Sequence, residues 1–125
     1  MAGPNPHLVV ALFHIFLVAP FLLYVAIQRT SVPIWIYWLL FAIGLLITIY
    51  HGAKAVLKYL EKLPSIWVNI IHAVYLGPLL IYMGWKKYDT PRAAYEILAL
   101  FGFAALGYHF LTVVNLVQEG AALSK

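Results

Sequence analysis

Four histidines lie inside long apolar stretches of the chain, where ionisable side chains are uncommon. They are His14, His51, His72 and His109. Neutral imidazole is a ligand for zinc, copper and iron, and two imidazoles on facing helices supply both axial ligands of a b-type haem. Polar side chains in apolar surroundings are usually paired or face a ligand site. The four residues therefore predict a shared polar site, provided that all of them turn inward.

The surroundings of these histidines repeat along the chain. Shifting the sequence by 58 residues places His14-x5-Pro20-x3-Tyr24 on His72-x5-Pro78-x3-Tyr82. The same shift aligns the pairs Pro33 and Pro91, Tyr37 and Tyr95, Gly44 and Gly102, and Tyr50-His51 and Tyr108-His109. Apolar helices match by chance at Leu and Val, but not at His, Pro and Tyr together. We interpret the match as an internal repeat.

The elements that must position the histidines are transmembrane helices. The chain has 125 residues, of which 65% are hydrophobic and 10% charged. A soluble chain this small could not bury so much apolar surface, whereas a bilayer can. A membrane-crossing helix needs about 20 mostly apolar residues, and four segments qualify, at about 8–27, 33–57, 66–85 and 91–117. The predicted fold class is an all-α, multi-pass integral membrane protein, a four-helix transmembrane bundle of up-down-up-down topology.

The chain is expected to form one transmembrane domain over residues 1–125. Repeat 1 covers about 8–58 and repeat 2 about 66–117, and the tail 118–125 is expected to fray. Each repeat is a helical hairpin with two crossings, so both insert the same way round. This predicts a pseudo-two-fold axis along the membrane normal.

Aromatic side chains gather near the ends of the expected helices. Residues of this kind form the interfacial belt of a membrane-spanning protein. The candidates are Tyr24, Trp35, Tyr37, Trp38, Tyr59, Trp67, Trp85 and Tyr88.

Counting along the helices places the histidines at a common depth. His14 lies about seven residues into the first segment and His51 about seven before the end of the second. Because these helices are antiparallel, both lie in the same leaflet, roughly 10 Å below the apolar boundary. The repeat places His72 and His109 at the same level. We expect a layer of four imidazoles in one leaflet.

One hypothesis for this layer is haem b, which would serve one-electron transfer and require a redox partner. Gly44 and Gly102 lie two helical turns before the second histidine of each repeat, where a missing side chain would admit a macrocycle. Lys54 and Lys58 follow on the same face towards the headgroups and could meet the haem propionates. Close helix packing for the glycines, and side chains extending to the interface for the lysines, are the alternatives.

A second hypothesis is a bare zinc, copper or iron ion. Four histidines would complete a tetrahedral site of the structural kind. Tyr50 and Tyr108 directly precede the second histidine of each repeat, and their hydroxyls could bind the ligand or orient an imidazole. An aromatic residue near the interface is the alternative for both.

A third hypothesis is a small proton or ion channel or transporter subunit with a His and Tyr pathway. Pro20 and Pro78 would kink the first and third helices and release carbonyls near the path. No acidic residue lies mid-membrane to support this function, and four short helices enclose little room without a homo-oligomer. A structural membrane protein whose repeat only packs is the remaining alternative.

Other classes find little support in the composition. The sequence holds no hydrolytic or transferase motif, so any activity would be redox, and whether the chain is an enzyme is left open. There is no cysteine and hence no disulfide or thiolate site. The formal charge of +4 suits anionic lipid headgroups in the bilayer. No stretch offers a soluble basic face for nucleic acid.

Overall fold

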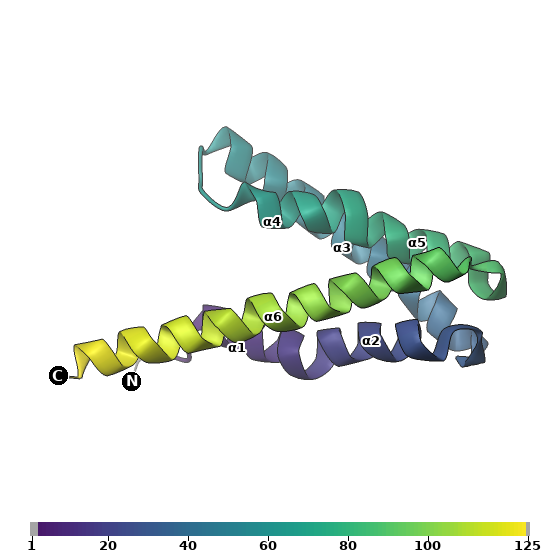
Figure 1. The fold of residues 1–125 in the computed structure, drawn as a ribbon. Helices are drawn as coiled ribbons and strands as arrows, with labels where there is room; N and C mark the ends of the chain where they lie inside the picture. Colours follow the sequence, from purple (N-terminus) through teal and green to yellow (C-terminus); the bar gives the residue numbers. More distant parts are fainter. Residues whose placement is uncertain (1–2, 125) are drawn as a thin grey trace. The chain divides into compact units, whose positions relative to one another are not determined.

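Four long helical spans build the protein in a computed structural model, which describes residues 3–124. The spans run over Pro6–Ser31, Ile34–Leu60, Ile66–Asp89 and Arg92–Leu123 (Figure 1). Each is long and apolar enough to cross a bilayer. Within residues 3–124 no strand occurs. The prediction of an all-helical chain with four helices of membrane-spanning length is confirmed.

The first and third spans share one pattern of interruptions. The first consists of α1 (Pro6–Phe13), the π-helical turn η1 (His14–Val18), α2 (Ala19–Gln28) and the 3-10 turn η2 (Arg29–Ser31). The third consists of α4 (Ile66–Ile71), the π-helical turn η3 (His72–Leu76), α5 (Gly77–Lys86) and the 3-10 turn η4 (Lys87–Asp89). The second and fourth spans are the single helices α3 (Ile34–Leu60) and α6 (Arg92–Leu123).

A proline follows each π turn and explains it. Proline has no N–H, and its ring collides with the carbonyl four residues earlier, so an α-helix cannot pass through it unchanged. Pro20 and Pro78 are accommodated by a wider turn. The N–H of Ala19 donates to the carbonyl of His14, and that of Gly77 to the carbonyl of His72, five residues back in each case. The distortion expected at each proline is thus a π turn that begins at a histidine.

Two helix ends differ from the prediction. Pro33 lies before α3 rather than in it, with an extended backbone at ψ 155°, and its carbonyl accepts from the N–H of Ile36. The prediction of a frayed tail over 118–125 is wrong for most of its length, because α6 continues to Leu123. Gln, Glu, Ala and Leu in this stretch are good helix formers. Residue 125 lies outside the described part.

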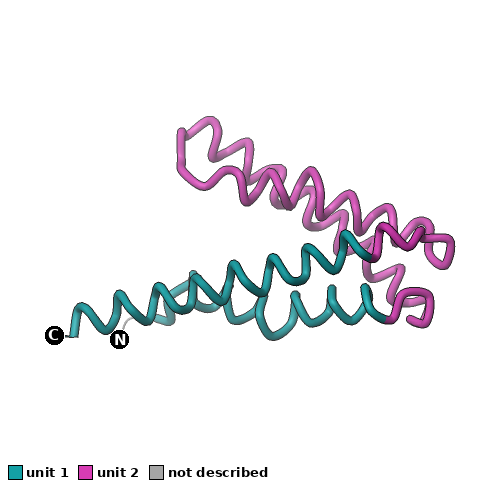
Figure 2. The backbone as a smooth tube through the Cα atoms, viewed as in Figure 1, with its two compact units in different colours: residues 1–27, 96–125 teal, residues 28–95 magenta. Residues whose placement is uncertain are grey.

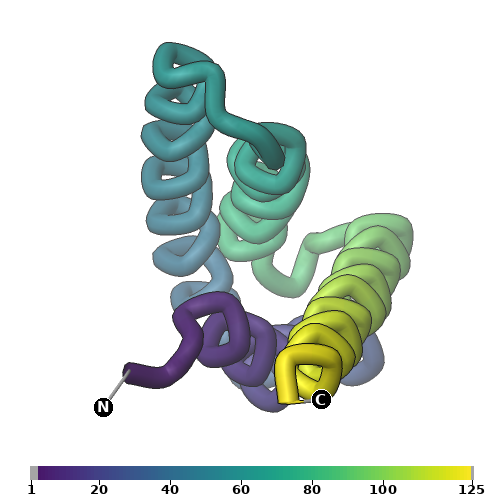
Figure 3. The backbone as a smooth tube through the Cα atoms, turned by 90° about the vertical axis from the view of Figure 1, so that its left-hand side faces the viewer, coloured from purple at the N-terminus to yellow at the C-terminus, as the bar shows by residue number. Residues whose placement is uncertain are grey.

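The chain divides into two compact units (Figure 2). Unit 2 is residues 28–95, in which α3 and the third span lie side by side and antiparallel, joined by residues 61–65 (Figure 3). Unit 1 joins the first span, up to Ile27, to α6 from Glu96 onward. Each unit therefore combines one span of each sequence repeat. The hairpins expected from the repeat are not these units, because sequence similarity identifies equivalent segments and not packing partners.

Glycine allows the two spans of unit 2 to approach closely. A Cβ on Gly44 would lie 2.7 Å from the backbone nitrogen of Ile81 and 2.8 Å from the carbonyl oxygen of Gly77. A Cβ on Gly84 would lie 2.6 Å from the backbone nitrogen of Phe41. Small residues are the usual means by which membrane helices bring their backbones together. The contact is therefore set by residues that lack a side chain.

Two buried tyrosines form a hydrogen bond in unit 2. The hydroxyls of Tyr37 and Tyr95 are 2.6 Å apart, and the two side chains are 0% and 2% exposed. The Tyr37 hydroxyl also donates to the carbonyl of Arg29, at 3.4 Å. The prediction of Tyr37 as a belt residue is wrong, because its hydroxyl has buried partners and does not need the interface. The other predicted belt residues are exposed, as expected.

Candidate functional site

The histidines of unit 1 form a stacked pair. His14 begins the π turn η1, and its Nδ1 donates to the carbonyl of Val10 at 2.8 Å. Its ring stacks on that of His109 from α6, with centroids 4.1 Å apart and planes 23° apart. Both side chains are half-buried. The antiparallel packing of the first span and α6 thus brings one histidine of each repeat into contact.

The histidines of unit 2 form an equivalent pair. His72 begins η3, and its Nδ1 donates to the carbonyl of Val68 at 2.6 Å. Its ring stacks on that of His51 from α3, with centroids 4.4 Å apart and planes 23° apart. The Nδ1 of His51 donates to Oδ1 of Asn69 at 3.1 Å. Asn69 is 5% exposed, so this amide is a buried polar neighbour of the pair.

The hydrogen bonds at Nδ1 define the chemistry of these rings. A carbonyl oxygen only accepts, so His14 and His72 each carry a proton on Nδ1. In the neutral ring the lone pair is then on Nε2. Metal-binding histidines commonly donate their other ring N–H to a carbonyl or a carboxylate, which fixes the tautomer and the direction of the ligand nitrogen. Both π-turn histidines have this arrangement.

The two tyrosines that precede His51 and His109 pack against those rings. Tyr50 meets the His51 ring edge-on at 5.1 Å between centroids, and Tyr108 meets the His109 ring at 5.2 Å. About half of each tyrosine side chain is exposed. They border the histidine pairs through their rings, and a role of their hydroxyls stays a prediction.

The two predicted glycines serve helix packing. Gly44 faces Ile81 in unit 2, and a Cβ on Gly102 would lie 2.8 Å from the side chain of Leu23 in unit 1. Leu23 and Ile81 are themselves 58 residues apart, so one contact occurs twice. Close packing is the alternative that the sequence leaves open for these glycines, and it accounts for both.

The two predicted lysines interact near the linker of unit 2. The Nζ of Lys54 lies 5.7 Å from the centroid of the Tyr50 ring. Lys58 donates to the carbonyl of Ser65 at 3.4 Å, which ties α3 to the start of the third span. These contacts suit side chains that extend along the protein towards the headgroups. A role in binding propionates stays a prediction.

The donor set at each pair is two imidazoles. Among residues 3–124, no group of three or more His, Cys, Asp or Glu side chains is placed to hold a metal ion. A haem would need the two rings to point at its iron from opposite sides of a macrocycle. Here the rings are in face contact and the glycines are packed against neighbouring helices. The pairs as they stand suit a small ion better than a macrocycle.

Sequence reasoning missed Asn69. Its signal was a single amide in an apolar run, three residues before His72 and so on the same helical face. The repeat did not reveal it, because the equivalent residue is Ala11, which is buried in unit 1. The two histidine pairs therefore differ at one buried position.

Comparison with known proteins adds no relative. No protein-family model matches the chain, and no curated protein and no solved structure matches it.

Proposed function

We propose that the protein is a metal-binding integral membrane protein in which each histidine pair holds one transition metal ion. The observation that carries the proposal is the Nδ1–carbonyl hydrogen bond of His14 and of His72, each with a second imidazole in contact. This arrangement occurs twice, at equivalent positions of the repeat. Packing alone requires neither a fixed tautomer nor a second histidine.

The chemistry of the donors favours copper or zinc, with iron as a further option. All three accept imidazole nitrogen, and no thiolate or carboxylate joins either pair within the described residues. Binding requires the rings to turn out of face contact until both Nε2 atoms lie about 2.0–2.1 Å from the ion. Two protein ligands leave coordination positions for water or another ligand. The bound ion would join two antiparallel spans, which gives it a structural or sensing role.

We propose further that the spans run up-down-up-down about a pseudo-two-fold axis along the membrane normal. Several backbone features that recur 58 residues apart support this, among them positive φ at Arg29 (51°) and Lys87 (53°). The Tyr37–Tyr95 contact supports it as well, because equivalent residues touch only near a two-fold axis.

The proposed topology can be tested with single cysteines, since the chain has none of its own. Thr30→Cys and Asp89→Cys are expected to react with an impermeant maleimide from the same side of sealed vesicles. Lys62→Cys, in the linker between the second and third spans, is expected to react only from the other side. Labelling of positions 30 and 89 from opposite sides would overturn the topology.

The metal proposal is tested by elemental analysis and an absorption spectrum of one detergent-purified sample. Two zinc or copper ions per chain and no Soret band are expected. One ion per chain would indicate instead the single four-histidine site expected from the sequence, and a Soret band that shifts on reduction would indicate haem. Neither metal nor haem, after both are supplied during expression, would overturn the proposal. Proton or ion flux in liposomes would then separate transport from simple packing.

A further inference from the structure

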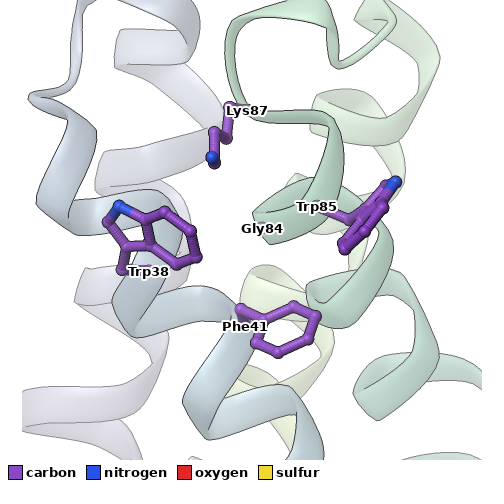
Figure 4. Close-up of a pocket in the computed structure, with 5 residues that line it drawn as sticks. All are labelled: Trp38, Phe41, Gly84, Trp85 and Lys87. Atoms are coloured by element: carbon purple, nitrogen blue, oxygen red, sulfur yellow. The ribbon is translucent and has the colours of Figure 1, made fainter.

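A second candidate site lies in unit 2, between α3 and the end of the third span. It is a pocket of about 230 Å³ lined by Trp38, Phe41, Gly84, Trp85 and Lys87 (Figure 4). Phe41 and the two tryptophans make it largely apolar, and the lysine is its one charged lining residue. The Nζ of Lys87 lies 4.0 Å from the centroid of the Trp38 ring, within the range of a cation–π interaction.

The backbone places the ammonium group of Lys87 at this pocket. Lys87 has φ 53° and ψ −125°, in a region that residues other than glycine rarely adopt. Such a conformation costs on the order of 1–3 times what a single ordinary hydrogen bond contributes. The turn starts η4 directly after α5 and holds Lys87 half-buried, whereas the preceding Lys86 is exposed. In Figure 4 the lysine side chain extends towards Trp38.

The repeat provides an internal comparison for the pocket. Shifted by 58 residues, its lining corresponds to Glu96, Ala99, Ala26, Ile27 and Arg29. A positive charge and a positive φ recur at Arg29. The three aromatic rings do not recur. The turn is thus a property of the repeated fold, whereas the aromatic lining belongs to unit 2 alone and requires another explanation.

We propose that this pocket binds one anionic phospholipid. The lipid phosphate would bond to the ammonium of Lys87, and the glycerol and upper acyl chains would lie on Trp38, Phe41 and Trp85. The pocket is apolar with a cation beside it, at the end of two membrane spans, which complements a lipid with a negative headgroup. The proposal is independent of the metal sites.

The position of Lys87 also selects among headgroups. The face of Trp38 is already covered by an ammonium group at 4.0 Å. A choline headgroup would have to displace that cation to reach the ring. The phosphate of an anionic lipid adds to the cation without displacing it, and no positive group on the lipid opposes it. We therefore expect phosphatidylglycerol to bind in preference to phosphatidylcholine.

The test is native mass spectrometry of the full chain in detergent, with phosphatidylglycerol or phosphatidylcholine of the same acyl chains. One phosphatidylglycerol is expected to remain bound, and Lys87→Gln is expected to weaken its binding about five-fold, the effect of one basic residue near a lipid surface. Lys86→Gln is the matched control, because it removes the same charge one residue away, outside the pocket lining. It should change binding less than two-fold.

Three results would overturn the proposal. Equal losses in Lys87→Gln and Lys86→Gln would show attraction to surface charge only. Equal binding of the two lipids would show that the headgroup is not recognised. Displacement of the lipid by millimolar inorganic phosphate would show a phosphate site in place of a lipid site. If Lys87→Gln fails to fold, Lys87→Gly serves in its place, because glycine adopts the φ of this position without strain.

Discussion

Replacing His72 with alanine is expected to lower the metal content from two ions per chain to one. The substitution removes the ligand of unit 2 whose Nδ1 is fixed by the carbonyl of Val68. A single imidazole, that of His51, would remain there, and one neutral nitrogen does not hold an ion in apolar surroundings. The pair of His14 and His109 in unit 1 is untouched and should keep its ion. Elemental analysis of purified variants measures the outcome.

The matched control for this experiment is His7→Ala. His7 is exposed, lies outside both pairs and has no equivalent in the repeat. Its loss should leave two ions per chain. If His72→Ala also retained two ions, the pair in unit 2 would not be a metal site.

Asn69 offers a finer probe of the same site. Asn69→Ala removes the acceptor of the His51 N–H but leaves both imidazoles in place. Loss of such an orienting partner usually weakens metal binding 10–100-fold. The ion of unit 2 should therefore be stripped by a chelator at a lower concentration in this variant, while the ion of unit 1 is unaffected. Ala11, the equivalent of Asn69, provides no such partner to unit 1.

Replacing Gly44 with alanine is expected to destabilise the protein by about 1–3 kcal/mol or more, as overpacking does. The new Cβ would lie 2.7 Å from the backbone nitrogen of Ile81, and a backbone atom cannot move aside as a side chain can. The two spans of unit 2 would have to separate. The free energy of unfolding, measured by titration with a denaturing detergent, reports the change.

Two other glycines calibrate this prediction. Gly102→Ala should cost less, because the nearest atoms belong to the flexible side chain of Leu23. Gly107→Ala should be neutral or stabilising, since nothing lies within 4 Å of its Cβ position and alanine favours a helix by up to about 1 kcal/mol. If all three substitutions had the same effect, helix propensity rather than close packing would explain the glycines.

Much of the candidate site followed from counting along the chain. The four apolar segments were found because a helix that crosses a bilayer has a minimum length. The equivalence of His14 and His72 followed from their matching distance to a proline. That proline also places the π turn, because its missing N–H disrupts the helix at a defined residue. These properties are local, and the sequence by itself determined them.

The partners of each histidine were decided only by the tertiary structure. Counting gives the depth of a residue along a helix, but the direction of its side chain depends on how the helix is rotated against its neighbour. His14 therefore could not be assigned to His109, or Asn69 to His51, before the packing was known. Tyr37 illustrates the same limit, since near a helix end only the buried hydroxyl of Tyr95 distinguishes it from a belt residue. Length, period and proline position act along one chain segment, whereas pairing depends on side-chain shape and hydrogen bonds between segments.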